Sequence, residues 1–196
     1  MATMATATAT DPASPPLPAS GLPDAGFHTW EARDGTPVLV RPIEPSDLEL
    51  EREFVDRLSP QTGYQRLLNP RKPSTDELQR WTRIDRAREG ALIATASLGG
   101  RLQQIGVARY VMEAADGDAE FAIVIADAWQ GTGLGAHLLS ALIELARESG
   151  VRRLSGTTLS ENKAMLGLAR RLGFKRSRQA GAAMYTELAL ALQPES

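Results

Sequence analysis

Three short apolar segments follow one another near the middle of the chain and are separated by glycine-containing turns. The segments are residues 91–98, 104–112 and 119–126, and the turns are Gly99-Gly100 and Asp116-Gly117. Short β-rich runs joined by such turns are typical of antiparallel strands that pair in sequence order. The pattern therefore predicts a three-stranded meander.

The segments after the meander alternate between helical and extended patterns. Leucines recur at helical spacing within residues 134–149, and Gly150 ends that helix. The elements expected after it are a strand at 151–159, a helix at 162–172 closed by Gly173, and a strand pair at 175–179 and 184–190. The strand before the 134–149 helix and the strand after it form a β-α-β unit.

The first half of the chain predicts one strand and two or three helices. Residues 36–41 form a β-rich run that Pro42 ends, and a helix follows Ser46-Asp47 to about residue 58. A further helix begins at the capping box Ser74-x-x-Glu77. We therefore expect an α/β (mixed α+β) fold, with a mixed, largely antiparallel sheet, helices on both faces and a central β-α-β unit.

The N-terminal segment differs in composition from the rest of the chain. Ala, Thr, Pro and Ser dominate residues 1–26, which have no apolar periodicity. Such a segment buries too little apolar surface to offset the entropy of ordering it. It also lacks the basic and apolar regions of a secretory signal. We expect a disordered tail at 1–28, one domain at 29–191, a short tail at 192–196, and a cytoplasmic protein.

Composition excludes several kinds of chemistry. The 196 residues suit one domain. The chain has no cysteine, which excludes disulfides, a cysteine nucleophile and thiolate metal sites. His28 and His137 are its two histidines, so a metal site built from several histidines is not expected. No run of about 18 apolar residues is present, so no membrane span is expected.

Charge is unevenly distributed along a chain whose net charge is -2. Residues 150–178 hold eight basic residues and one acidic residue, Glu161. A basic segment attracts phosphate, although it also occurs as an ordinary solvated face. Leucines that we expect in the core alternate with these charges, and Phe174 is the one aromatic residue among them, so the segment lacks aromatic interleaving and is not predicted to bind nucleic acid.

The turn that joins the third meander strand to the next helix is rich in glycine. It reads Asp127-Ala128-Trp129-Gln130-Gly131-Thr132-Gly133-Leu134-Gly135-Ala136. Such a turn directs backbone N–H groups toward one point beside the positive end of the helix dipole. Glycines allow the backbone angles that this needs and let a phosphate approach closely. The turn is therefore predicted to bind an anion.

Three phosphate-binding patterns can be compared with this turn. A Walker A loop requires Lys-Ser or Lys-Thr after its last glycine, whereas Ala136-His137 stand here. Gly131, Gly133 and Ala136 fit the Rossmann pattern, but an antiparallel meander precedes them and no acidic residue ends the next strand. The third pattern, Gln-x-x-Gly-x-Gly, fits Gln130, Gly133 and Gly135.

This third pattern resembles the pyrophosphate-binding motif of the GNAT acetyltransferases. The resemblance extends over about residues 30–190 and includes the element order and the block from Asn162 to Leu172-Gly173-Phe174. The amino-acid sequence is also similar to that of the GNAT domain of bacterial protein lysine acetyltransferases, for example in Leu58-Ser59-Pro60 and Gly106-Val107-Ala108-Arg109-Tyr110. The resemblance implies an acetyl-CoA-dependent N-acetyltransferase.

The family resemblance also implies roles for individual residues. Acetyl-CoA is expected in a cleft where the 119–126 and 151–159 strands separate, with Ile123 and Ile125 offering backbone groups to its pantetheine arm. The pyrophosphate is expected on the N–H groups of the glycine-rich turn, from Gln130 through Gly131, Thr132, Gly133, Leu134, Gly135 and Ala136. Asn162 matches an asparagine that contacts the cofactor, although asparagine is also a favoured helix N-cap.

A base must deprotonate the acceptor amine. A lysine amine has a pKa of ~10.4, so neutralising it at pH 7 costs ~4.6 kcal/mol. A carboxylate whose pKa is raised by partial burial accepts that proton directly or through water. Glu120 is the acidic residue within Ala119–Ala126, and family lysine acetyltransferases carry a glutamate base near this position. A strand-end carboxylate with no catalytic role is the alternative.

One position departs from the commoner family pattern. Ala169 stands where many members have a tyrosine that protonates the leaving thiolate, so Tyr185, Ser160 or water would serve, or no acid is used. We expect a protein lysine as acceptor. A small amine or amino acid, and a non-catalytic acetyl-CoA sensor, are the alternatives. No metal is expected, and the sequence leaves the acceptor and the oligomeric state open.

Overall fold

The computed structural model describes residues 27–67, 71–112, 117–177 and 183–193. The helices and strands follow one another in the order predicted from the sequence, and one further strand lies near the N-terminus. Their bounds are β1 (His28–Glu31), β2 (Pro37–Pro42), the 3-10 helix η2 (Pro45–Asp47), α1 (Leu48–Arg57), α2 (Pro60–Leu67), α3 (Thr75–Thr82), β3 (Glu89–Leu98), β4 (Arg101–Met112), β5 (Asp118–Ile125), the 3-10 helix η3 (Asp127–Trp129), α4 (Leu134–Glu148), β6 (Arg153–Leu159), α5 (Lys163–Arg171), β7 (Lys175–Ser177) and β8 (Tyr185–Ala191).

The eight strands that the structure describes form one sheet in the order β1-β2-β3-β4-β5-β6-β8-β7. Every neighbouring pair is antiparallel except β5 and β6, which run parallel. The strands β3, β4 and β5 form the predicted meander, and β5-α4-β6 is the predicted β-α-β unit. The expected mixed α/β fold is confirmed.

Strand β1 was missing from the sequence-based prediction. It has four residues and pairs with β2 alone, with Trp30 opposite Val38. A run this short carries too little alternation to indicate a strand by itself. It begins at His28, which the prediction had placed in the tail, whereas residues 1–26 lie outside the described ranges. The strand predicted at 175–179 is described only as far as Ser177.

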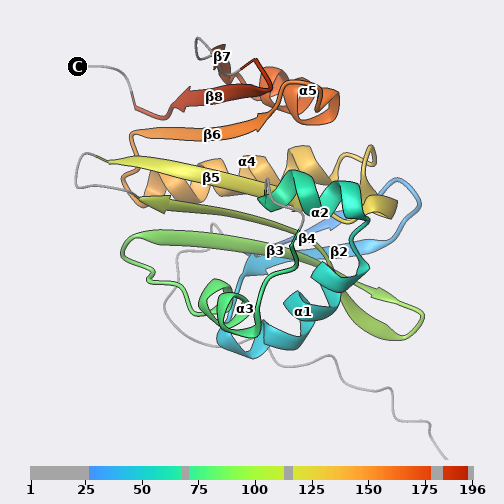
Figure 1. Ribbon diagram of the computed structural model, residues 1–196. Helices are drawn as coiled ribbons and strands as arrows, with labels where there is room; N and C mark the ends of the chain where they lie inside the picture. Colours follow the sequence, from blue (N-terminus) through green and yellow to red (C-terminus); the bar gives the residue numbers. More distant parts are fainter. Residues whose placement is uncertain (1–26, 68–70, 113–116, 178–182, 194–196) are drawn as a thin grey trace, which may run out of the picture.

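Helices cover both faces of the sheet, with α4 on one face and α1 and α3 on the other (Figure 1). The larger core joins α4 and α5 to strands β2–β6, and Leu134, Leu138 and Leu142 of the predicted leucine stripe are fully buried in it. Each such burial contributes about 1.5–3 kcal/mol. A smaller core joins Phe54 of α1 to β3, β4 and Val124 of β5.

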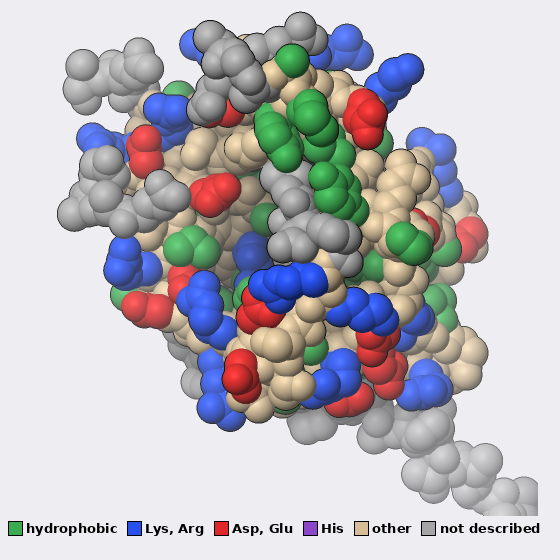
Figure 2. All heavy atoms as spheres, viewed as in Figure 1, with side chains coloured by type: hydrophobic (Ala, Val, Ile, Leu, Met, Phe, Trp, Pro, Cys, Tyr) green, Lys and Arg blue, Asp and Glu red, His purple; other side chains and the backbone are tan. Residues whose placement is uncertain are grey.

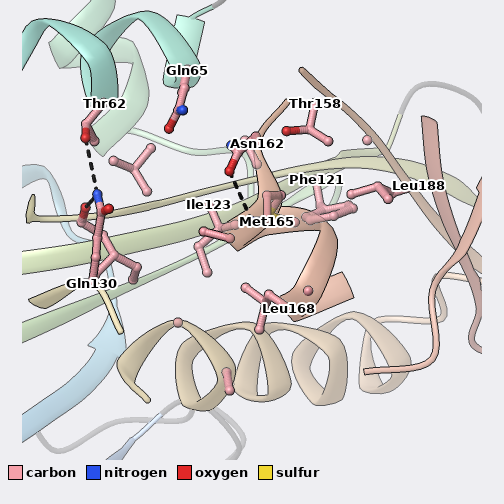
Figure 3. Close-up of a pocket in the computed structure, with 18 of the residues that line it drawn as sticks. Thr62, Gln65, Phe121, Ile123, Gln130, Thr158, Asn162, Met165, Leu168 and Leu188 are labelled. Atoms are coloured by element: carbon pink, nitrogen blue, oxygen red, sulfur yellow. Dashed lines mark hydrogen bonds between the residues drawn. The ribbon is translucent and has the colours of Figure 1, made fainter. Parts of the chain in front are cut away.

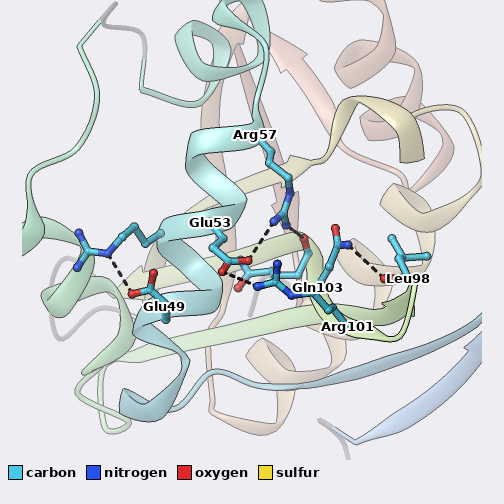
Figure 4. A network of polar contacts seen from close by, with 8 residues as sticks. Glu49, Glu53, Arg57, Leu98, Arg101 and Gln103 are labelled. Atoms are coloured by element: carbon cyan, nitrogen blue, oxygen red, sulfur yellow. Dashed lines mark hydrogen bonds and ion pairs between the residues drawn. The ribbon is translucent and has the colours of Figure 1, made fainter.

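Polar contacts hold α1 against the hairpin formed by β3 and β4 (Figure 4). Arg57 donates to the backbone oxygen of Gln104 at 3.1 Å, and Glu53 pairs with both Arg57 and Arg101. Exposed pairs of this kind contribute about 0–1 kcal/mol each. Basic and acidic side chains are interspersed over this face (Figure 2). No helix within the described ranges is long and apolar enough to cross a membrane.

A histidine pair ties strand β1 to the first turn of α4. The Nε2 atoms of His28 and His137 lie 2.6 Å apart, and the Trp30 ring stacks on His137. Burial lowers the pKa of both histidines, and the charge on His28 lowers that of His137 further. The pair is therefore held in its neutral form, with one ring donating to the other.

We expect acid to destabilise the fold through this pair. Because the pKa of each histidine is lower in the folded chain, the unfolded chain takes up protons first as the pH falls below about 6.5. The stabilisation is complete above that pH and is lost as the pH falls through the folded-state pKa values. The melting temperature should fall by a few degrees between pH 7.5 and 5.5.

The control is the double variant His28→Gln/His137→Gln, which contains no histidine. The carboxyl groups with lowered pKa values, Asp34, Glu77 and Asp127, do not titrate between pH 5.5 and 7.5. The double variant should therefore lose most of the pH dependence in this window. An unchanged slope of melting temperature against pH would show that other groups cause it.

Candidate active site

A cavity of about 530 Å³ opens where β5 and β6 separate. The two strands pair only over three residues each, ending at Glu120 and Ser155. Beyond this point they diverge, and residues of α2, the glycine-rich turn and α5 complete the walls (Figure 3). Because the two strands are hydrogen-bonded at one end and diverge at the other, the fold gains a cavity while the rest of the sheet stays paired.

Backbone groups of β5 face into this opening. The N–H of Ala126 donates to Ile105 of β4 at 2.9 Å, and Arg152 donates to the backbone oxygen of Gly117 at 2.8 Å. Because hydrogen-bonding direction alternates along a strand, even-numbered residues of β5 face β4 and odd-numbered residues face β6. Ile123 and Ile125 lie beyond the last paired residue, so their backbone groups face the cavity.

The glycine-rich turn forms one end of the cavity. Gly131 and Gly133 have φ angles of +75° and +104°, a region that favours glycine. Gly133 is the N-cap of α4, and Ala136 and His137 both donate to its backbone oxygen at 3.1 Å. Among the described residues, the N–H groups of Gly131, Thr132, Gly133 and Gly135 have no acceptor within the protein. Four unsatisfied donors at a helix N-terminus form a geometry that suits an anion.

The side chain of Gln130 is held by the protein itself. Its Nε2 donates to Thr62 Oγ1 and to the backbone oxygen of Ile125, both at 3.2 Å, and its own N–H donates to Asp127. The Ile125 oxygen is thus already engaged in this structure. Gln130 lines the cavity but joins β5 to α2, so the free N–H groups of the turn begin at Gly131.

Asp127 anchors the N-terminus of α2 beside the same turn. Its carboxylate accepts from Ser59 N, Ser59 Oγ and Thr62 Oγ1 at 2.9, 2.6 and 2.7 Å. Burial raises the pKa of Asp127, but the hydrogen bonds from Ser59 and Thr62 outweigh it and hold the pKa below its ordinary value. The carboxylate is therefore ionised at neutral pH.

Asn162 has the N-cap role that was the alternative to cofactor contact. Its Oδ1 accepts from the N–H of Met165 at 3.1 Å in the first turn of α5. It also lines the cavity, so capping and contact with a ligand are compatible. Of the basic residues described in the segment 150–178, Arg171 alone lines the cavity, on the same helix.

Glu120 lines the cavity at the point where the strands begin to diverge. Its side chain is exposed, so the partial burial expected of a base is not found. Side chains alternate between the two faces of a strand, so Glu120 shares a face with Val124, which packs in the α1 core. The carboxylate therefore points to the α1–α3 side of the sheet.

Most of the predicted binding residues line the cavity, and two do not. Leu134 is wholly buried in the core, and the Thr132 hydroxyl donates to the Trp129 backbone oxygen at 2.7 Å. The lining also includes residues that sequence reasoning missed, among them Thr62, Gln65, Gly156, Thr157, Thr158, Met165, Leu168 and Leu188. Helix spacing and glycine content gave no signal for them because α2 and β6 meet the cavity only in the folded chain.

Neither side chain considered as a general acid lines the cavity. Ser160 shares a hydrogen bond with Thr186 at 2.9 Å, and Tyr185 pairs with Leu159 along β6 and β8. Ala169 is completely buried in the core. Of the candidates for the general acid, water therefore remains. The alternative that the thiolate leaves without an acid also remains.

Comparison with known proteins agrees with this geometry. A family model described as an acetyltransferase (GNAT) domain matches residues 38–175. An acetyltransferase of Pseudomonas aeruginosa is 38% identical over 151 residues, which are 76% of this chain and 81% of the relative. Acetyltransferase Pat of Mycolicibacterium smegmatis is 33% identical over 73% of this chain, which spans only 43% of Pat.

Two further comparisons extend this result. An L-methionine sulfoximine/L-methionine sulfone acetyltransferase of Pseudomonas aeruginosa is 40% identical over 98 residues, 48% of this chain and 56% of that protein. The crystal structure of the GNAT domain of S. lividans PAT has a TM-score of 0.76 and 29% identity, and the match covers 87% of this chain and 99% of that one. This chain therefore belongs to the GNAT acetyltransferases, enzymes whose acyl donor is acetyl-CoA.

Proposed function

We propose that this protein transfers the acetyl group of acetyl-CoA to the side-chain amine of a protein lysine, with Glu120 as general base. The observation that carries the proposal is the diverging strand pair β5–β6. It has unsatisfied N–H donors at its open end and a carboxylate where the strands meet. One elongated cavity thus offers a phosphate site, a free strand edge and a base in that order.

Each part of the cavity corresponds to one part of the donor. The N–H groups of Gly131, Gly133 and Gly135 would hold the pyrophosphate, with Leu134 and Thr132 contributing only backbone groups. The free edge at Ile123 would accept the pantetheine arm as an added strand. Asn162 and Arg171 would contact the donor from α5. In this arrangement the thioester would lie toward Glu120.

Starting from the ammonium form of the acceptor, the reaction needs the loss of two protons and one bond exchange. The neutral amine attacks the thioester carbonyl, the C–N bond forms and the C–S bond breaks. Glu120 takes the proton that the ammonium group loses before the attack, directly or through water, and the second proton, which the nitrogen loses once the C–N bond has formed, passes to water. The coenzyme leaves as a thiolate, whose pKa near 8.5 makes it a tolerable leaving group without an acid.

The exposure of Glu120 favours an acceptor carried on a larger molecule. A lysine side chain presented on a protein surface reaches an exposed carboxylate without being enclosed. The likeness to Pat and to the S. lividans PAT domain is consistent with this proposal. The likeness to the L-methionine sulfoximine/L-methionine sulfone acetyltransferase favours a small amino acid as the second candidate.

An acceptor comparison separates these two candidates. Release of the coenzyme thiol would be measured with N-terminally blocked lysine peptides, with free amino acids and with methionine sulfone. We expect kcat/KM to be at least about tenfold higher for the peptides, a difference of about 1.4 kcal/mol. A preference of similar size for a free amino acid would replace the protein-lysine proposal with the small-molecule one.

A further inference from the structure

Helix α2 is joined to the cavity by a chain of hydrogen bonds that the proposed chemistry does not use. Ser59 Oγ accepts from the N–H of Thr62 at 3.2 Å, as an N-cap does, and also donates to Asp127. Thr62 Oγ1 donates to Asp127 and accepts from Gln130 Nε2, which also donates to the Ile125 oxygen. The chain runs from α2 to the edge of β5.

This chain does more than cap a helix. A serine N-cap needs only the Ser59–Thr62 contact, whereas Asp127 adds three bonds across a separation of 65–68 residues. Thr62 is 7% exposed, so its hydroxyl sits in a protected position between two partners. Ser59 Oγ also lies 3.2 Å from this hydroxyl, so removing Asp127 or Gln130 would cost the buried group one of its hydrogen bonds and leave the others.

The part of the cavity that this chain controls lies on the acceptor side. Thr62 and Gln65 point from α2 into the cavity, opposite Leu168 of α5 (Figure 3). The Glu120 side chain and helix α2 lie on the same face of the sheet, the one that carries α1–α3. The N–H donors of Gly131, Gly133 and Gly135 take no part in the chain. A displaced α2 would therefore alter the wall beside the base while leaving the phosphate site in place.

We propose that Asp127 is a positioning residue for acetyl transfer, which fixes α2 as the acceptor-side wall of the cavity. The proposal rests on the proposed function. Asp127 touches neither donor nor acceptor and acts through Ser59 and Thr62.

The test uses Asp127→Asn in the full chain. Asparagine keeps the shape of the side chain and one accepting oxygen, but its Nδ2 cannot accept. Either the bond from Ser59 N to Oδ2 or the two hydroxyl bonds to Oδ1 are therefore lost, together with the negative charge. We expect the KM for the acceptor to rise at least fivefold, while the Kd for acetyl-CoA, measured by calorimetry, changes less than twofold. Thr62→Val, which removes the hydroxyl and keeps the volume, should act in the same way, and Thr62→Ser should restore most of the wild-type KM.

The double variant Asp127→Asn/Thr62→Val tests whether the two residues form one unit. Its KM should be close to that of either single variant, because coupled residues do not add. Asp34→Asn is the matched control, since Asp34 also accepts a backbone N–H, at 3.0 Å from Thr36, but lies in the turn between β1 and β2. It should leave both constants unchanged.

Hydrogen exchange gives a readout that does not depend on catalysis. Asp127→Asn should accelerate exchange of the amides in α2 at least tenfold and leave those in α4 unchanged. An acceptor KM within twofold of wild type with unchanged α2 exchange would overturn the proposal, as would an equal loss of acetyl-CoA affinity. An inactive wild-type protein with faster α2 exchange in the variant would instead refute the proposed function and retain the anchoring role.

Discussion

Gly133→Glu is expected to reduce the affinity for acetyl-CoA at least a hundredfold, about 2.7 kcal/mol. Gly133 has a φ angle of +104° at the N-cap of α4, where an L side chain costs about 1–2 kcal/mol. A new carboxylate at this point would compete for the free N–H groups of the turn and would repel the pyrophosphate. This competition and this repulsion both weaken acetyl-CoA binding, which calorimetric titration measures directly.

The added side chain should not disrupt packing, because a Cβ at position 133 meets only Trp30, at 3.7 Å. Gly150→Glu is the matched control. Gly150 follows the same helix at its other end, has a φ angle of +79° and has open space around its Cβ position. It carries the same strain and charge without the phosphate site. Equal loss of affinity in the two variants would indicate destabilisation, and unchanged affinity in Gly133→Glu would place the phosphate elsewhere.

The parts of the site that could be predicted from the sequence are those built from local backbone geometry. The spacing of glycines between a strand and a helix indicates by itself which positions need backbone angles that favour glycine. Gly131 and Gly133 have such positive φ angles. The leucine stripe of α4 predicted its buried face for the same reason. Local rules apply here because each element's neighbours along the chain are also its neighbours in space.

The parts that could not be predicted depend on contacts between distant segments. Thr62 and Gln65 line the cavity because α2 lies beside β5, where Thr62 donates to Asp127, more than sixty residues later. Nothing in the spacing of Ser59, Thr62 and Asp127 indicates that contact. The exposure of Glu120 was also hidden, because it depends on how far β6 diverges and not on the pattern within β5.

Glu120→Gln is expected to lower kcat/KM at neutral pH by about 10²–10⁴, the usual contribution of a general base. Glutamine keeps the size and hydrogen-bonding reach of the side chain but cannot take the proton from the amine. Since Glu120 is exposed and closes no part of the core, stability and the Kd for acetyl-CoA should change little. Steady-state rates and calorimetry on the same preparations separate the two quantities. Glu49→Gln, which removes an exposed carboxylate on α1 that pairs with Arg52, is the control and should retain wild-type rates.

The pH dependence of the variant identifies the cause of the loss. Without a base, the reaction depends on the fraction of acceptor that is already neutral, which rises about tenfold per pH unit below the lysine pKa of ~10.4. The rate of Glu120→Gln should therefore increase steeply toward high pH and approach that of the wild type, because the amine no longer needs help to lose its proton. A variant that stays equally impaired at pH 9.5 would show that Glu120 positions the acceptor instead. A variant within twofold of wild type at pH 7 would show that the proton leaves by another route, through water held by groups such as Gln65 or Thr158 in the cavity wall.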